Sequence, residues 1–241
     1  MNELSLTKNF VLTTSRVNHK GVLDIDGCMD LFMDIATEHA KEIGIGLKVQ
    51  EEKDQFWVAV HSKIRIYSKP YLEDNLTLTT WPAVPEKILC PRYYELCDEK
   101  GETLIDGRTD WSIIHKSTGH LSRDRNIYPE DSVYKKPLEF SDFDKSKFKN
   151  CSELLGTYKV KIGDIDIGGH MNNVAYLRAL KSLFSCSEWG NLSIKELEIQ
   201  YKKACHEMDL LNFFVQKENH ELFVKIMNEN ELAATIKLLL Y

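Results

Sequence analysis

The sequence has no long hydrophobic run, and its first residues are not expected to form a secretory signal. Within its 241 residues, no apolar stretch approaches the roughly 20 residues that a membrane-spanning helix needs. The first ten residues, MNELSLTKNF, lack the basic start and the apolar body of a secretory signal. We therefore expect a cytoplasmic protein with no membrane span.

Cysteines are few, and their spacing suits neither a metal site nor a disulfide framework. None of the six belongs to a CxxC pair, so most are expected to be small, buried apolar residues. They are Cys28, Cys90, Cys97, Cys151, Cys186 and Cys205. A formal net charge of −6 also argues against nucleic acid as a general partner.

Apolar residues are abundant enough to build sizeable cores. Hydrophobic residues make up 43% of the chain, which suits one large domain or two of about 100 to 150 residues each. A helix is predicted from about Cys28 to Ile43, and Gly44 ends it. The buried stripe of this helix comprises Met29, Phe32, Met33, Ala36, Ala40 and Ile43.

Strands are predicted after this helix, and an extended segment at 10–14 precedes it. Four stretches rich in β-branched and aromatic residues are expected to form an antiparallel sheet, with a hairpin turn at 98–101. These stretches are 56–67, 76–81, 88–97 and 103–115.

The second half repeats this order of elements. A strand at 156–162, a glycine-containing turn and a helix precede four further predicted strands. These strands are 194–201, 208–216, 222–227 and 232–240. Asp24-Ile25-Asp26 also matches Asp164-Ile165-Asp166. The simplest explanation is duplication of one α+β unit. In each copy a helix follows the predicted first strand and precedes a four-stranded meander. The expected division is a first unit at 1–128, a connector at 129–150 and a second unit at 151–241.

The segment from Lys161 to Phe184 (KIGDIDIGGHMNNVAYLRALKSLF) concentrates the groups that suit chemistry. Asn172 or Asn173 can cap a following helix by accepting its free backbone N–H groups, which places His170 at the helix start. The positive end of the helix dipole then points at His170 and suits a carbonyl oxygen that becomes negative. The apolar face of this helix comprises Val174, Leu177, Leu180 and Phe184.

One other motif leads to a different function and is set aside. The stretch from Val22 to Gly27 resembles the DxDG opening of aspartate-nucleophile phosphatases, where carboxylates hold magnesium. That motif ends a buried strand of a parallel sheet, whereas little strand precedes Asp24 and the chain that follows reads as antiparallel.

The stretch DIDIGGHMNNVAYL around His170 is similar to the DxDxNxHxNNxxY segment of the acyl-acyl-carrier-protein thioesterases, the bacterial relatives of the plant enzymes that end fatty-acid synthesis. An ordered set of further matches spans nearly the whole sequence. It comprises the helix of Asp30 to Gly44, the Trp57 strand, LTLTTWP ending at Pro82, the turn of Asp98 to Glu102, and Trp111 to His115 followed by Ser117-Thr118.

The resemblance implies a fold, an activity and a partner. The fold is α+β, a tandem or double hotdog in which two long central helices are each wrapped by an antiparallel sheet. The activity is hydrolysis of a fatty acyl thioester on the phosphopantetheine of acyl carrier protein, with no cofactor and no metal. The alternative is a non-catalytic acyl-thioester binding protein with a degenerate site. Pairing of hotdog units into a homodimer is left open.

The family's catalytic residues match this sequence in part. The catalytic Asp and His fall on Asp166 and His170, while the Asn falls on Gly168 and the Glu falls on Ala204. The two departures motivate the binding-protein alternative. Cys205 and Glu207 are candidates for compensation. Glu207 replaces the missing carboxylate only if the chain bulges between them, since a shift of three reverses the face of a strand.

Each candidate also has a structural interpretation. His170 is either the general base or a solvated loop histidine, and Asp166 either orients it or forms a local Asx turn. Cys205 is more often a buried inert thiol than a nucleophile. Asn172 and Asn173 are candidates for capping the helix. Met29, Phe32, Met33 and Ala36 form either an acyl tunnel or plain core. Lys202 and Lys203 are candidate basic residues for docking the carrier protein.

Overall fold

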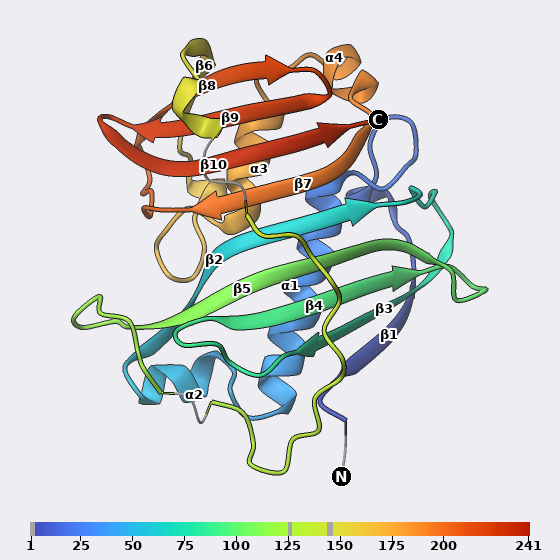
Figure 1. The fold of residues 1–241 in the computed structure, drawn as a ribbon, viewed down its shortest axis with the longest axis vertical. Coiled ribbons are helices and arrows are strands. Elements are labelled where there is room, and N and C mark those ends of the chain that lie inside the picture. The colour runs from blue at the N-terminus through green and yellow to red at the C-terminus, as the bar shows by residue number, and fades with distance from the viewer. Residues whose placement is uncertain (1–2, 125–126, 144–146) are drawn as a thin grey trace. The chain divides into compact units, whose positions relative to one another are not determined.

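The computed structural model describes residues 3–124, 127–143 and 147–241, which fall into two compact units. The first unit comprises Met1–Val60 with Ile66–Phe140, and the second comprises His61–Arg65 with Ser141–Tyr241. Each unit contains one main helix and an antiparallel sheet (Figure 1). The expected α+β class with antiparallel pairing is therefore confirmed.

The first unit orders its strands β1-β3-β4-β5-β2. Its helices are α1 (Ile25–Glu42) and the short α2 (Leu47–Glu52), which the sequence pattern did not predict. Its strands are β1 (Leu6–Val11), β2 (Gln55–Ile66), β3 (Asn75–Pro82), β4 (Cys90–Cys97) and β5 (Thr103–His115).

The second unit orders its strands β7-β10-β9-β8-β6, and residues 61–65 of β2 pair antiparallel with β7. Its helices are α3 (Asn173–Lys181) and α4 (Cys186–Asn191). Its strands are β6 (Glu153–Lys159), β7 (Ile194–Tyr201), β8 (Leu210–Glu218), β9 (Glu221–Asn228) and β10 (Glu231–Leu240).

The two units share one strand plan, which supports duplication but corrects the expected meander. In the first unit β3, β4 and β5 are neighbours in sequence and in space, as are β8, β9 and β10 in the second. The strand that directly follows the helix region lies beyond the end of this run, so β2 neighbours β5 and β7 neighbours β10. Such non-local pairing leaves no local signal in the sequence.

The repeated Asp-Ile-Asp letters do not occupy equivalent positions. In the first unit the Asp24 backbone N–H donates to the Arg16 carbonyl at 3.2 Å, and the Asp24 side chain caps α1. The matching contact in the second unit runs from the Asn172 N–H to the Asp164 carbonyl at 2.7 Å, and Asn172 caps α3. Asn172 is therefore the counterpart of Asp24, and the identity with Asp164 is coincidental.

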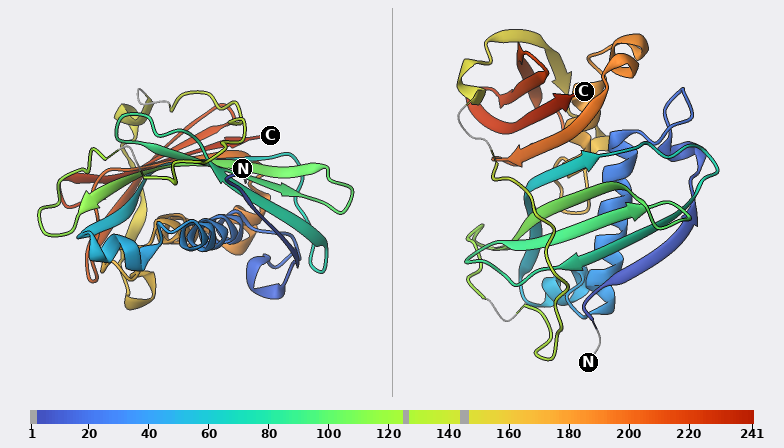
Figure 2. Two further views of the ribbon diagram at one scale, coloured as in Figure 1. Left: turned by 90° about the horizontal axis from the view of Figure 1, so that it is seen from below. Right: turned by 45° about the vertical axis from the view of Figure 1, so that its right-hand side comes forward.

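α1 packs against one face of the first unit's sheet (Figure 2). Met29, Phe32 and Ala36 are buried, as their spacing predicted, while Met33 is half-buried. The Phe32 ring stacks on Tyr94 of β4 with centroids 4.5 Å apart. This contact makes Phe32 part of the helix-to-sheet core.

α3 is shorter than the long central helix that the sequence predicted. It spans nine residues and ends at Lys181, so Phe184 lies outside it and packs against Trp189. The chain changes direction because Ser185 and Glu188 form a capping box that starts α4. Val174, Leu177 and Leu180 are buried as expected, and Arg178 is exposed.

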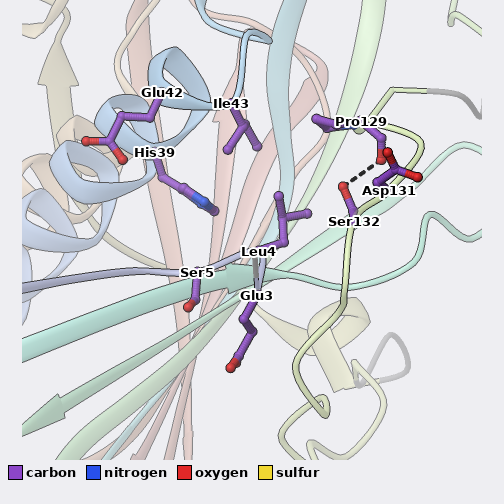
Figure 3. A pocket seen from close by; sticks show the side chains of 9 residues that line it. All are labelled: Glu3, Leu4, Ser5, His39, Glu42, Ile43, Pro129, Asp131 and Ser132. Atoms are coloured by element: carbon purple, nitrogen blue, oxygen red, sulfur yellow. Dashed lines mark hydrogen bonds between the residues drawn. The ribbon is translucent and has the colours of Figure 1, made fainter. Parts of the chain in front are cut away.

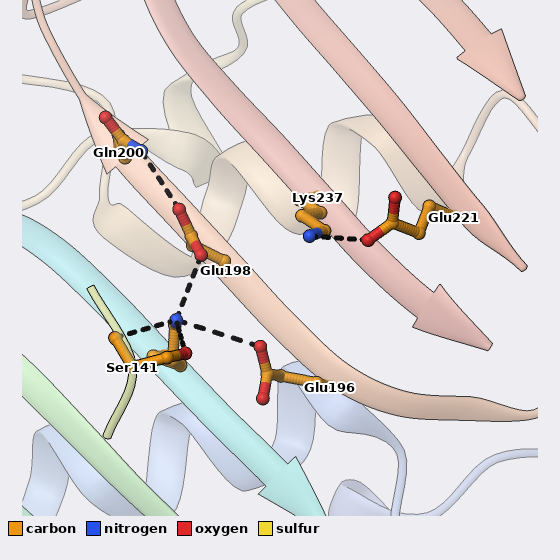
Figure 4. A network of polar contacts seen from close by, with 7 residues as sticks. Ser141, Glu196, Glu198, Gln200, Glu221 and Lys237 are labelled. Atoms are coloured by element: carbon orange, nitrogen blue, oxygen red, sulfur yellow. Dashed lines mark hydrogen bonds and ion pairs between the residues drawn. The ribbon is translucent and has the colours of Figure 1, made fainter. Parts of the chain in front are cut away.

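A buried polar cluster lies on the sheet of the second unit (Figure 4). The Lys63 ammonium is 3.1 Å from Glu198 and 3.8 Å from Glu196, and it donates to the carbonyl and the hydroxyl of Ser141. The Lys63 side chain is only 2% exposed. Gln200 donates to Glu198 at 3.0 Å, so the carboxylate has two donors. The cluster therefore holds the segment around Ser141 against β2.

Most of the cysteines are buried, as the sequence predicted. Four of the six cysteines are buried, namely Cys28, Cys90, Cys151 and Cys205, and all six are free thiols. Among the helices of the described residues, none has the length and apolar character needed to cross a membrane.

Candidate functional site

The loop between β6 and α3 folds on its own backbone and places His170 just ahead of the helix. The Asp164 carboxylate accepts hydrogen bonds from the Tyr158 hydroxyl and from the Lys161 N–H, both at 2.8 Å. The Asp166 N–H donates to the His170 carbonyl at 2.9 Å, and Gly169 has a φ of +76°, a left-handed conformation that favours glycine. The loop thus closes tightly, with its carboxylate at Asp164 already used by local donors.

Asn172 is the N-cap of α3, which confirms one of the two predicted cap residues. Its Oδ1 accepts the Val174 N–H at 2.9 Å. Asn173 is the first helical residue, and its carbonyl accepts the Tyr201 hydroxyl at 3.1 Å. His170 therefore lies two residues before the cap, at the positive end of the helix dipole.

Asp166 forms the local turn that was one of its two interpretations. Its Oδ1 accepts the Gly168 N–H at 2.7 Å, and its backbone bonds to His170. Within the described residues, no hydrogen bond joins its carboxylate to the imidazole of His170. The orienting role of Asp166 stays a prediction, and the turn itself already fixes the backbone around His170.

His170 is half-buried and meets a second histidine that sequence analysis did not single out. Its ring centroid lies 5.0 Å from that of His206, and the two planes are inclined at 62°. The Met171 N–H donates to the Cys205 carbonyl at 2.8 Å, which joins the two segments next to the rings. A lone histidine in a polar loop gives no periodic signal, so only the fold reveals this pair.

Cys205 is fully buried, and its surroundings disfavour a thiolate. Burial raises the pKa of the Cys205 thiol, and the hydrogen bond with Tyr176 only partly offsets this effect. The thiol sulfur lies 3.9 Å from the Lys203 carbonyl, which is an acceptor. A nucleophilic cysteine needs the opposite shift in pKa.

Glu207 lies in a turn and not on a strand. β7 ends at Tyr201 and β8 begins at Leu210, so strand alternation does not apply between Ala204 and Glu207. Both of these residues are exposed. Glu207 could replace the missing carboxylate only if the strand bulged, but the chain has left the sheet altogether at this point. The catalytic role of Glu207 stays a prediction.

A pocket of about 530 Å³ opens in the first unit beside the end of α1 (Figure 3). It is lined by Glu3, Leu4, Ser5, His39, Glu42, Ile43, Pro129, Asp131 and Ser132. The predicted tunnel residues Met29, Phe32, Met33 and Ala36 do not line it. The acyl tunnel at those four residues therefore stays a prediction.

His39, which borders this pocket, is buried next to Arg92, and its burial favours the neutral imidazole. The Arg92 guanidinium donates to His39 Nδ1 at 2.9 Å and also to the Thr80 hydroxyl at 3.2 Å. Burial, and secondarily the Arg92 charge, lower the pKa of His39 to about 4. Because Nδ1 accepts from Arg92, neutral His39 carries its proton on Nε2.

This depressed pKa predicts an acid-sensitive stability. The folded pKa of about 4 lies below the ordinary 6.5, so His39 contributes stability above pH 6.5 that is lost as pH falls toward 4. Between pH 7 and pH 5 the loss should be about 2 kcal/mol in the free energy of unfolding. Urea unfolding of wild type and His39→Gln at both pH values checks this, since the variant should lack that part of the loss. Parallel pH dependences in the two proteins would refute it.

Two units of helix and curled antiparallel sheet, built on one strand plan, define a tandem hotdog protein with an imidazole before the second helix. The family models for the acyl-ACP thioesterase N-terminal and C-terminal domains match residues 3–127 and 148–236. The chain therefore belongs to the acyl-ACP thioesterase family.

Solved structures share the fold along the whole chain. An acyl-ACP thioesterase from Bacteroides thetaiotaomicron has a TM-score of 0.88 at 22% identity, covering 99% of this chain and 98% of that one. The 12:0-ACP thioesterase from Umbellularia californica has a TM-score of 0.85 at 15% identity, covering 100% and 98%. These likenesses support the tandem hotdog fold.

Curated relatives are longer than this chain. The chloroplastic oleoyl-acyl carrier protein thioesterase 2 of Arabidopsis thaliana is 22% identical over 94% of this chain and 67% of the relative. The chloroplastic palmitoyl-acyl carrier protein thioesterase of Cuphea hookeriana is 20% identical over 86% of this chain and 54% of the relative. The chain thus spans about half to two thirds of these relatives.

Proposed function

We propose that this chain hydrolyses the thioester between a fatty acyl group and the phosphopantetheine of acyl carrier protein, which ends growth of that acyl chain. The observation that carries the proposal is His170, half-buried directly before the capped start of α3 in a member of this family. The relatives are named for oleoyl, palmitoyl and 12:0 substrates, so the substrate class is a medium or long acyl chain.

In the proposed reaction His170 handles both proton transfers. Neutral His170 accepts a proton from water while the water oxygen bonds to the thioester carbonyl carbon. The carbonyl oxygen then carries the negative charge. When this intermediate collapses, the carbon–sulfur bond breaks, and the imidazolium returns its proton to the sulfur. The products are the free fatty acid and the carrier thiol.

The developing negative charge requires a donor at the helix start. The Val174 N–H is used by the Asn172 side chain and the Ala175 N–H by the Asn172 carbonyl. Among the described residues, the Asn173 N–H has no hydrogen-bond acceptor, so we assign it to the oxyanion. The helix dipole adds to the stabilisation at this end.

Exposed apolar side chains lie in the two loops that carry His170 and His206, and they support contact with a substrate or partner. Ile162 and Ile167, in the loop before His170, are 73% and 79% exposed, and Met208, after His206, is 62% exposed. The Met208 N–H donates to the Val160 carbonyl at 3.0 Å, so the two turns are neighbours. Apolar groups gathered on a surface mark interaction sites.

Docking of the acidic carrier protein is proposed at Lys202 and Lys203. Both are exposed, although Lys203 is ion-paired with Glu231 and Lys202 donates to Gln200. The variant Lys202→Gln/Lys203→Gln should raise KM for acyl-carrier substrate about three- to tenfold at low salt, with kcat unchanged. Kinetics with acyl coenzyme A should not change.

The matched control for this docking variant is Lys217→Gln, an exposed lysine on β8. It should leave both KM values unchanged. An equal KM for the carrier substrate in the double variant and in the control would remove these two lysines from the docking surface.

A chain-length series of acyl-carrier and acyl coenzyme A substrates tests the proposed function. We expect steady release of free fatty acid well beyond one equivalent per protein, with a preferred acyl length. Saturable binding of acyl carrier protein without product would overturn the proposal and leave the binding-protein alternative, which Gly168 and Ala204 motivate.

A further inference from the structure

The turn that carries His206 is held rigidly against its neighbours. The His206 N–H donates to the Asp209 carboxylate at 2.8 Å, and the Asp209 N–H donates back to the His206 carbonyl at 3.2 Å. The same carboxylate oxygen accepts the Asn228 side chain at 2.6 Å, and the Val160 N–H donates to the Asp209 carbonyl at 2.9 Å. The turn that carries His206 is therefore held by hydrogen bonds within itself, to Asn228 and to Val160.

The backbone of His170 is fixed to the same turn. The hydrogen bond from Met171 to Cys205 joins the residues that follow and precede the two histidines, and the rings meet edge to face at 5.0 Å. Within the described residues, His206 is the ring in contact with His170. An edge-to-face contact fixes ring orientation and is favourable for aromatic groups.

We infer that His206 is a positioning residue for His170 in the proposed hydrolysis. Its ring fixes the orientation of the His170 imidazole toward water and the thioester. A neutral His206 ring also stabilises the imidazolium that forms on His170, whereas a protonated His206 repels it.

Charged residues also lie in the two segments that carry the pair. Asp166 stands in the loop of His170, while Glu207 and Asp209 share the turn of His206. The Asp166 and Asp209 carboxylates each accept a backbone N–H, and the Lys203 ammonium is paired with Glu231. These bonds hold the Asp166 and Asp209 carboxylates on the backbone, and the group in ring contact with His170 within the described residues is His206.

The inference rests on the proposed function and is tested first by kinetics. His206→Ala should lower kcat about 10- to 100-fold with KM nearly unchanged, because misplacing a catalytic group by about 1 Å costs this much. His206→Phe, which keeps an aromatic ring, should recover activity to within about threefold of wild type.

The control is His220→Ala, an exposed histidine in the turn between β8 and β9, which should match wild type. Circular dichroism and melting temperature establish that each variant is folded. A His206→Ala variant within twofold of wild type would overturn the inference. Equal loss in His206→Phe and His206→Ala would also overturn it, since the ring would then not be what positions His170.

A second measurement does not require turnover. In wild type, NMR should detect cross-relaxation between the ring protons of His170 and His206, because the two rings meet edge to face at 5.0 Å. In His206→Phe the same effect should join the His170 ring to the phenyl ring, and in His206→Ala the His170 ring should lose its single orientation. A His170 ring that keeps the same single orientation in His206→Ala would overturn the inference whether or not the protein is active, whereas absence of wild-type turnover with the ring contact present would count against the proposed function alone.

Discussion

The variant His170→Ala is expected to lower kcat at least about a hundredfold, the loss typical when a general base is removed. KM for the acyl carrier substrate should change little, since in the proposed mechanism His170 acts on water and on the sulfur and not on the acyl chain. The measurement is steady-state release of carrier-protein thiol by equal concentrations of wild type and variant.

His220→Ala is the matched control for this loss, as an exposed histidine in the same unit. It should retain wild-type turnover, and both variants should keep the wild-type melting temperature. Turnover by His170→Ala within threefold of wild type would remove His170 as the base and with it the proposed mechanism.

The variant Lys63→Met is expected to destabilise the protein by about 3 to 5 kcal/mol in the free energy of unfolding. It removes the cation that is 3.1 Å from Glu198 and leaves that buried carboxylate with Gln200 as its remaining donor. It also removes the bonds to Ser141, which hold the segment leading into the second unit. Denaturant unfolding of wild type and variant measures the loss.

Two controls separate the buried charge from the loss of a lysine. Lys217→Met, on the exposed surface of β8, should change the free energy of unfolding by less than about 0.5 kcal/mol. Lys63→Met/Glu198→Leu should recover part of the stability, because the apolar pair leaves only Glu196, whose side chain is 21% exposed, without its ion pair. A loss below 1 kcal/mol in Lys63→Met would show that the ion pair contributes little.

Local patterns in the sequence predicted most helices and strands, because these elements depend on residues that are neighbours along the chain. The predicted strands 103–115 and 194–201 coincide with β5 and β7, and the helix before Gly44 is α1. The pairing of β2 with β5 and of β7 with β10 was not predictable in this way. These pairs join strands that are distant along the chain, where periodicity carries no information.

Two of the predictions were wrong although the sequence contained evidence against them. Ser185 and Glu188 have the Ser-x-x-Glu spacing of a capping box, which marks a new helix start and explains why α3 ends before Phe184. The Asp-Ile-Asp repeat suggested that Asp24 and Asp164 are counterparts, yet the cap and backbone contacts pair Asp24 with Asn172. A short sequence identity between the two units is weaker evidence for equivalent positions than a capping contact that both units share.

The candidate site was predictable where chemistry and local structure coincide. His170 before the cap Asn172 follows from the letters themselves, because a capping asparagine fixes the helix start. The contact between His170 and His206 depends on how two loops meet, as does the burial of Cys205. Neither can be inferred from residues adjacent in sequence.

The intact mass of the wild-type protein during steady-state turnover tests most directly whether water, activated by His170, attacks the thioester. Many equivalents of free fatty acid are expected while the protein mass stays that of the unmodified chain. An acyl adduct that accumulates during turnover and is lost in Cys205→Ser would contradict it, because the buried thiol would then be the nucleophile.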